Sequence, residues 1–124
     1  MSSRRRPSLR EIDRRLKEAR KALIERNVSF ANEAKAVGEL FDLNIGDTKD
    51  LWPLILELLE EIKNTEYAGA HPPLKSVEPL IADCELYAFV WESTKLKKKM
   101  YFKFAIKDGF FYYVSLHRSR QPPR

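Results

Sequence analysis

The segment MYFKFAIKDGFFYYVSLHRSR, residues 100–120, constrains the fold of this chain more than any other. Alternate side chains can share one apolar face on both sides of Asp108-Gly109, and the segment is rich in aromatic and β-branched side chains. This pattern is typical of two β-strands joined by a tight turn. The strands are expected at residues 99–107 and 110–117, and the turn decides which side chains share a face.

Two loop lengths are compatible with the turn. A two-residue loop would pair Lys107 with Phe110 and divide the apolar side chains between both faces. A three-residue loop, with Gly109 in a left-handed bulge, would pair Ile106 with Phe110. We expect the three-residue loop, because it gathers the apolar side chains on one face and burial selects such a register. That core face would contain Met100, Phe102, Phe104, Ile106, Phe110, Tyr112, Val114 and Leu116.

The opposite face of the same hairpin would then be polar and cationic. Tyr101 is expected opposite Ser115, and His117 opposite Lys99, with Glu92 of the preceding strand close to both. Lys103 would face Tyr113, and Ala105 and Phe111 complete this face. We interpret this face as the exposed working surface of the sheet.

The N-terminal half is expected to be helical. Ser8 and Glu11 have the spacing of a capping box, and apolar residues follow at helical intervals to near residue 27. A third helix is predicted over residues 50–63, with Asp50 as N-cap and Pro53 in the first turn. Between them a shorter helix is expected after Ser29, with Phe30, Ala34, Val37 and Phe41 facing inward.

The remaining segments complete an α+β fold. Residues 67–79 contain one glycine and three prolines and are predicted to form the main loop. Residues 84–92 are apolar on both faces, as in a central strand. We therefore expect N-terminal helices packed on one face of a small antiparallel sheet, in a single domain at residues 9–118. A flexible basic arm, residues 1–8, and a flexible tail, residues 119–124, would flank it.

Charge is divided unevenly along the 124 residues. Residues 1–10 carry a net +4, residues 11–92 carry −7, and residues 93–124 carry +8. The cationic C-terminal part suits a polyanion, with nucleic acid the first expectation and an anionic membrane the second. A solvated surface or a site for an acidic protein partner is the alternative. A single cysteine, Cys84, and the lack of a transmembrane or signal segment indicate a cytoplasmic protein.

Three side chains of the polar face are candidate catalytic groups. His117 has the pKa range of a general acid or base, Tyr101 is a second proton donor, and Lys103 is a cation. The candidate RNA-binding residues are Lys98 and Lys99 in the basic turn, Lys75 in the long loop, Arg118, and Tyr113 and Phe111 as stacking rings. Two histidines and one cysteine form no metal-ligand pattern, and no cofactor motif is present.

The segment MYFKFAIKDGFFYYVSLHRS resembles the C-terminal signature of MqsR-type toxins in the RelE-like superfamily of mRNA interferases. LKEARKALIERN is similar to the first helix of that family, and EYAGA follows a helix at the corresponding place. The resemblance implies a RelE-like or microbial-RNase-like fold. It aligns the family's strand tyrosine and lysine with Tyr101 and Lys103, and its final basic residue with His117, where this chain has histidine in place of lysine. A lysine that follows a tyrosine, and a glutamine on the preceding strand, have no counterpart here.

What the resemblance implies is the toxin of a type II toxin–antitoxin pair. Such a protein would cleave mRNA without a metal ion, and an antitoxin protein would neutralise it. Two alternatives remain open on the residues alone: a non-catalytic module that binds RNA or DNA, and a basic protein-interaction domain.

Overall fold

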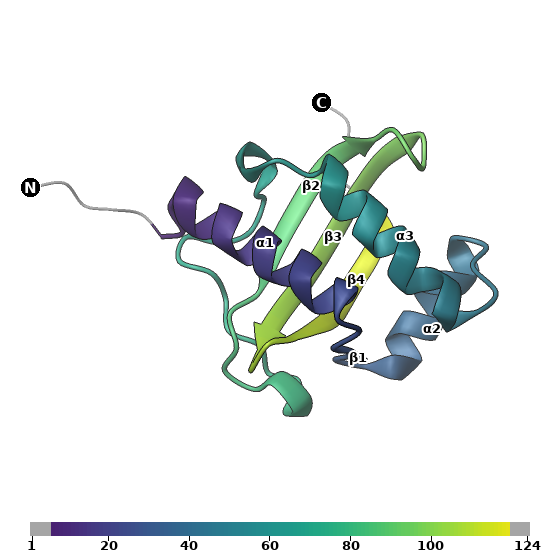
Figure 1. Cartoon of the computed structure of the whole chain (residues 1–124), viewed down its shortest axis with the longest axis horizontal. Coiled ribbons are helices and arrows are strands. Elements are labelled where there is room, and N and C mark those ends of the chain that lie inside the picture. The colour runs from purple at the N-terminus through teal and green to yellow at the C-terminus, as the bar shows by residue number, and fades with distance from the viewer. Residues whose placement is uncertain (1–5, 120–124) are drawn as a thin grey trace, which may run out of the picture.

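Residues 6–119 fold as three helices packed against a four-stranded sheet (Figure 1). The computed structural model describes residues 6–119, apart from the side chain of Thr48. The helices are α1 (Leu9–Ile24), α2 (Glu33–Asp42) and α3 (Thr48–Glu61), and the strands are β1 (Val28–Phe30), β2 (Tyr87–Ser93), β3 (Lys98–Lys107) and β4 (Phe110–Arg118). Two single turns of 3₁₀ helix, Asn64–Glu66 and Pro79–Ile81, interrupt the connection between α3 and β2. None of the helices in residues 6–119 is long and apolar enough to cross a membrane.

The sheet is mixed, with strand order β1-β4-β3-β2. Strands β2, β3 and β4 are antiparallel, and the short β1 adds to β4 in parallel. The predicted α+β class is therefore confirmed, whereas the prediction of residues 84–92 as a central strand is wrong, because β2 lies at the edge. The long loop pairs with the outer edge of β2 at the isolated bridge between Tyr67 and Phe89.

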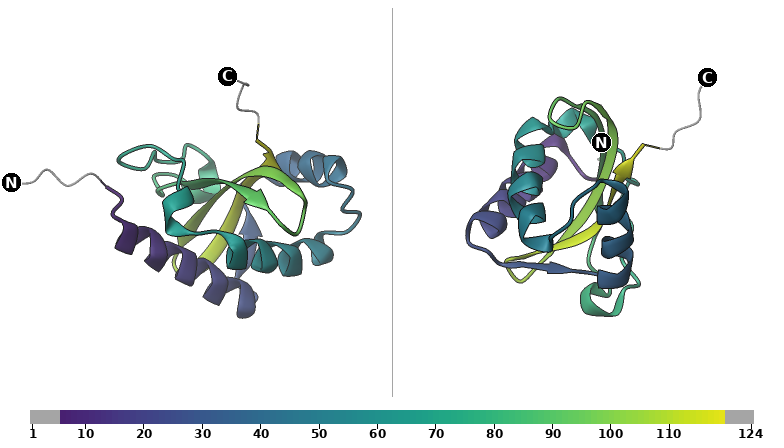
Figure 2. Two further views of the ribbon diagram at one scale, coloured as in Figure 1. Left: turned by 90° about the horizontal axis from the view of Figure 1, so that it is seen from above. Right: turned by 90° about the vertical axis from the view of Figure 1, so that its right-hand side faces the viewer.

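Helices α1 and α3 cover one face of the sheet, and α2 lies on the other side (Figure 2). The predicted capping of α1 is confirmed, since the Ser8 Oγ accepts a hydrogen bond from the Glu11 N–H at 3.1 Å. The N-cap of α3 is Asp47, three residues before the predicted Asp50. Pro53 consequently falls in the second turn of α3.

The phase predicted for α2 is wrong. Phe41 is 80% exposed and Val37 is also exposed, whereas Ala36 and Leu40 are buried. Phe30, which was expected on this helix, belongs to β1. The predicted stripe, Val37 and Phe41, and the buried stripe, Ala36 and Leu40, are offset by one residue. The packing of α2 beside β4 selects the stripe with the smaller side chains.

Aromatic rings of the sheet form the centre of the core beneath α1 and α3. Phe104 lies 5.9 Å from Phe89 and 5.3 Å from Phe111 between ring centroids, and Phe102 lies 6.0 Å from Phe111. All four side chains are fully buried. Helix α3 contributes four fully or almost fully buried aliphatic side chains to the same core: Leu51, Ile55, Leu58 and Leu59.

The hairpin between β3 and β4 closes with two residues, and the predicted three-residue loop is wrong. Lys107 pairs with Phe110, and Asp108 and Gly109 both have positive φ, 52° and 80°. Positive φ at both central positions defines a type I′ turn, whose twist matches that of the strands it joins. The odd residue that the prediction placed in the turn lies instead within β4.

Val114 is that odd residue. Tyr113 pairs with Phe104 and Ser115 pairs with Lys103, so Val114 has no partner of its own on β3. This β-bulge reverses the alternation of side chains along β4. Before the bulge, Phe111 and Tyr113 face the core; after it, Leu116 does.

The two-residue turn and the bulge together reverse the faces predicted for residues 110–114. Phe110, predicted in the core, is 42% exposed, and Tyr112 and Val114 pack in a small cluster on the opposite face with Ala105 and Ile81. The core positions predicted for Met100, Phe102, Phe104 and Leu116 are confirmed.

Residues 6–8, which were assigned to a flexible arm, are packed on the domain. Pro7 is buried, and the Arg6 guanidinium binds the carboxylates of Glu11 and Glu85, with N–O distances to Glu85 of 2.8 and 2.9 Å. Tyr87 lies between the same two carboxylates. Residues 1–5 and 120–124 lie outside the described residues, so the predicted flexibility of these ends stays a prediction.

Candidate functional site

Tyr101 and His117 lie side by side on the face of the sheet that α1 and α3 leave uncovered. They are direct partners across β3 and β4, and their rings stack with centroids 4.9 Å apart and an angle of 21° between the planes. Both side chains are half-buried. The sequence predicted this shared face but not the pairing: Tyr101 was expected opposite Ser115, and His117 opposite Lys99. The bulge at Val114 shifts the partners while leaving both rings on one side.

The hydrogen bond of His117 determines which ring nitrogen carries the proton. Its Nδ1 lies 2.7 Å from the carbonyl oxygen of Arg118. Because a carbonyl oxygen can only accept a hydrogen bond, Nδ1 must donate, and the neutral imidazole then carries its lone pair on Nε2. Nε2 is therefore the atom of His117 that is able to take up a proton.

Tyr101 is held in its neutral, proton-donating form. Burial raises the pKa of its phenol above the usual value, and the negative charge of Glu39 raises it further. The Lys103 ammonium lies 6.0 Å from the centroid of the Tyr101 ring, within the range of a cation–π contact. The three predicted catalytic residues thus occupy adjacent positions on two strands.

Glu39 of α2 holds this part of β4 in place. Its carboxylate accepts hydrogen bonds from the Tyr113 hydroxyl at 2.6 Å, the Ser115 hydroxyl at 2.7 Å and the Leu116 N–H at 2.9 Å. These three donors flank the bulge, so the carboxylate stabilises the register that places His117 next to Tyr101. It also raises the pKa of Tyr113 strongly, after the larger effect of burial. The sequence analysis did not identify Glu39, whose acidic side chain resembles the other solvated ones of the helices.

A depression lined by side chains of both charges borders His117. It has a volume of about 430 Å³ and is lined by Glu39, Asp42, Leu43, Lys98, His117, Arg118 and Ser119. Lys98 and Arg118, both predicted to bind RNA, are thus brought together beside the imidazole. Lys99 is the next residue of β3 after Lys98, and it pairs with Glu92 of β2, as predicted.

Three predicted RNA-binding residues do not join this site. Phe111 and Tyr113 are fully buried in the core, so the prediction that they stack on bases is wrong in this conformation. Lys75 lies in the long loop, where it bridges to Glu85 before the start of β2. Tyr101 pairs with Val90 of β2, which follows Glu85 by five residues. At the usual rise per residue, Glu85 and its partner Lys75 therefore lie about 17 Å from Tyr101 along the strand.

The described part of the chain contains no cluster of three or more histidine, cysteine, aspartate or glutamate side chains arranged to hold a metal ion. No family model matches the chain, and comparison with the curated proteins and with the solved structures finds no match either. The resemblance of residues 100–119 to MqsR-type toxins therefore stays a prediction from the sequence.

Proposed function

We propose that this protein is an endoribonuclease that cleaves single-stranded RNA through Tyr101, His117 and Lys103. The observation that carries the proposal is the stacked Tyr101–His117 pair, which presents a proton acceptor and a proton donor on one open face. Cleavage of RNA by its own 2′-hydroxyl needs a base, an acid and cations around the phosphate, and these three side chains supply all of them.

The protonation states assign the roles. The unprotonated Nε2 of His117 accepts the proton of the ribose 2′-OH, whose oxygen attacks the neighbouring phosphorus. The bond from phosphorus to the 5′-oxygen then breaks, which leaves a 2′,3′-cyclic phosphate. Tyr101 donates its proton to the departing 5′-oxygen, because an alkoxide is a stronger base than a phenolate. Lys103 balances the charge that develops on the phosphate oxygens.

The basic residues next to the pair support RNA as the substrate. Lys98 and Arg118 line the depression beside His117, where the adjoining phosphates of a bound strand would lie. Phe111 and Tyr113 lie in the core and add no stacking surface, so the rings open to a bound base beside these cations are those of Tyr101 and His117. The toxin role, the antitoxin partner and the cytoplasmic location extend the proposal on the strength of the sequence resemblance.

The test uses a labelled single-stranded transcript incubated with the pure protein in EDTA. We expect products that end in a 2′,3′-cyclic phosphate, and no cleavage of DNA of the same sequence, which lacks the 2′-OH. His117→Ala should lower the rate by about 10²–10⁴-fold, as the loss of a general acid–base group does. Tyr101→Phe should lower it as well.

The chain offers matched controls. His71 is the only other histidine, and Tyr112 lies on the same face of the sheet away from the pair. His71→Ala and Tyr112→Phe should retain the wild-type rate. Salt-sensitive RNA binding without cleavage would favour the binding-module alternative, and full activity of a folded His117→Ala protein would exclude the mechanism.

A further inference from the structure

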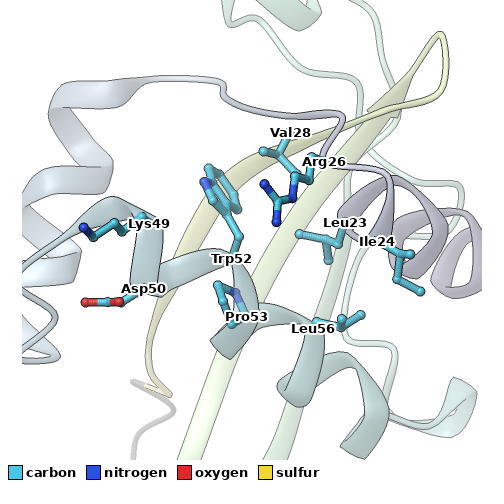
Figure 3. A pocket seen from close by; sticks show the side chains of 9 residues that line it. All are labelled: Leu23, Ile24, Arg26, Val28, Lys49, Asp50, Trp52, Pro53 and Leu56. Atoms are coloured by element: carbon cyan, nitrogen blue, oxygen red, sulfur yellow. The ribbon is translucent and has the colours of Figure 1, made fainter.

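A second concave site lies on the helix-covered side of the molecule, away from Tyr101 and His117. It is a cleft of about 660 Å³ between the end of α1 and the first turns of α3 (Figure 3). Its volume is within the range of small-molecule sites, which are mostly apolar with a few polar groups. The lining residues are Leu23, Ile24, Arg26, Val28, Lys49, Asp50, Trp52, Pro53 and Leu56.

The apolar wall of the cleft is centred on the indole of Trp52. This ring is fixed from behind by Phe30, at 5.0 Å between centroids, and by Phe111, at 6.4 Å. Across the cleft, Ile24 is 67% exposed although it is a large aliphatic side chain. A flat apolar group between Trp52 and Ile24 would remove both from water, which is the main source of affinity in such sites.

Arg26 supplies the polar group. It follows the end of α1 with a φ of 62°, and its guanidinium points into the cleft beside Trp52 (Figure 3). Within residues 6–119 its side chain makes no ion pair or hydrogen bond. Lys49, at the other end of the cleft, already has Asp47 at 3.7 Å. Arg26 is therefore the cation that is available to an incoming anion.

We propose that this cleft binds a small carboxylic acid with a flat apolar body. The body would lie against Trp52 and Ile24, and the carboxylate would accept two parallel hydrogen bonds from the Arg26 guanidinium, whose fork matches that shape. The cleft is built from two short segments, residues 23–28 and 49–56, so it suits a compact ligand better than an extended peptide. The other charged residues of the lining, Lys49 and Asp50, lie at one end of the cleft, and we expect a nucleotide to bind less tightly than the acid (Figure 3).

The two tryptophans provide a direct readout by NMR. Each gives one indole N–H cross-peak, and Trp91, which is buried and donates to Glu61 at 2.8 Å, serves as an internal reference. The peaks are assigned with Trp52→Phe. The probes are 3-phenylpropionate, 3-phenylpropan-1-ol as its uncharged counterpart, and AMP, each titrated to about 10 mM, since a ligand of about a dozen non-hydrogen atoms binds with a dissociation constant of about 1 mM or less.

We expect 3-phenylpropionate to shift the Trp52 peak saturably while the Trp91 peak stays in place. The acid should bind roughly tenfold more tightly than the alcohol, and Arg26→Gln should abolish this difference. Arg14→Gln, which removes an exposed arginine of α1 that does not line the cleft, should preserve it. No saturable Trp52 shift, equal affinity for acid and alcohol in the wild type, or AMP binding as tightly as the acid would each overturn the proposal. None of these results depends on RNA cleavage.

Discussion

Replacing Glu39 by alanine tests whether α2 fixes the geometry of the candidate site. The change removes the carboxylate that accepts three hydrogen bonds. The donors are the Leu116 N–H and the hydroxyls of Tyr113 and Ser115, and all three residues are buried. A hydrogen bond to a charged group contributes about 1.5–3 kcal/mol to the free energy of unfolding. Glu39 is half-exposed, so water replaces part of each lost hydrogen bond. We therefore take a contribution of about 1 kcal/mol for each bond.

The expected loss is therefore about 3 kcal/mol of unfolding free energy for Glu39→Ala. At about 4 °C per kcal/mol for a chain of this size, the Tm should fall by about 12 °C. Glu39→Gln should lose less, about 1–2 kcal/mol, because the amide oxygen still accepts while the NH₂ group faces other donors. Urea unfolding followed by circular dichroism measures the free energy, and hydrogen exchange of the Leu116 amide reports the edge of β4 directly.

The matched control is Glu60→Ala. Glu60 is exposed on α3 and has no ion pair or side-chain hydrogen bond among the described residues, so its loss should change the free energy of unfolding by less than about 0.5 kcal/mol. If Glu39→Ala costs no more than Glu60→Ala, or if exchange of the Leu116 amide is unchanged, then Glu39 does not hold the bulge. The explanation given for the Tyr101–His117 pairing would then be refuted.

Phe111→Ala should cost about 3–5 kcal/mol in urea unfolding and Phe110→Ala less than about 1 kcal/mol, because only Phe111 faces the core; equal losses would contradict the two-residue turn. Gly109→Ala should lower the unfolding free energy by about 1–2 kcal/mol, because alanine is strained at a φ of 80° although its Cβ would meet no atom within 4 Å; an unchanged Tm would contradict this. The Arg6 guanidinium holds the pKa of Glu85 below its usual value of 4.5, so this pair stabilises the fold fully above about pH 4.5 and the contribution is lost as the pH falls through the lowered pKa. Arg6→Gln should flatten that acid limb in Tm measurements between about pH 2 and 6, and an unchanged limb would show that the pair adds no stability.

The hairpin shows how far the sequence predicts this fold. The two strands, their antiparallel pairing and the shared face of Tyr101 and His117 all follow from alternation over residues 100–117. Gathering the apolar side chains of both strands on one face requires one unpaired residue in the hairpin. The turn was mispredicted because that requirement does not say whether the unpaired residue lies in the turn or within a strand. Asp108-Gly109 already forms a favoured two-residue turn, so the chain places that residue at Val114 instead. The stacking roles predicted for Phe111 and Tyr113 failed for the same reason.

The contribution of α2 had no comparable signal. Ala36 with Leu40 and Val37 with Phe41 both have helical spacing, and hydrophobicity alone favours the second pair. The structure selects the first, because α2 must approach β4 closely enough for Glu39 to reach the Leu116 N–H. That requirement depends on an edge of the sheet formed by residues more than 70 positions away, which local patterns do not encode.

The bulge at Val114 gives β4 one residue more than the stretch of β3 with which it pairs. Deleting the residue at 114 would leave the tip of the hairpin and its aromatic core in register. Every later side chain would also keep its partner on β3, because Ser115 would follow Tyr113 in regular alternation, so Leu116 would stay in the core and His117 would stay beside Tyr101. The bulge is therefore the position of β4 at which the chain can lose a residue without turning His117 away from Tyr101.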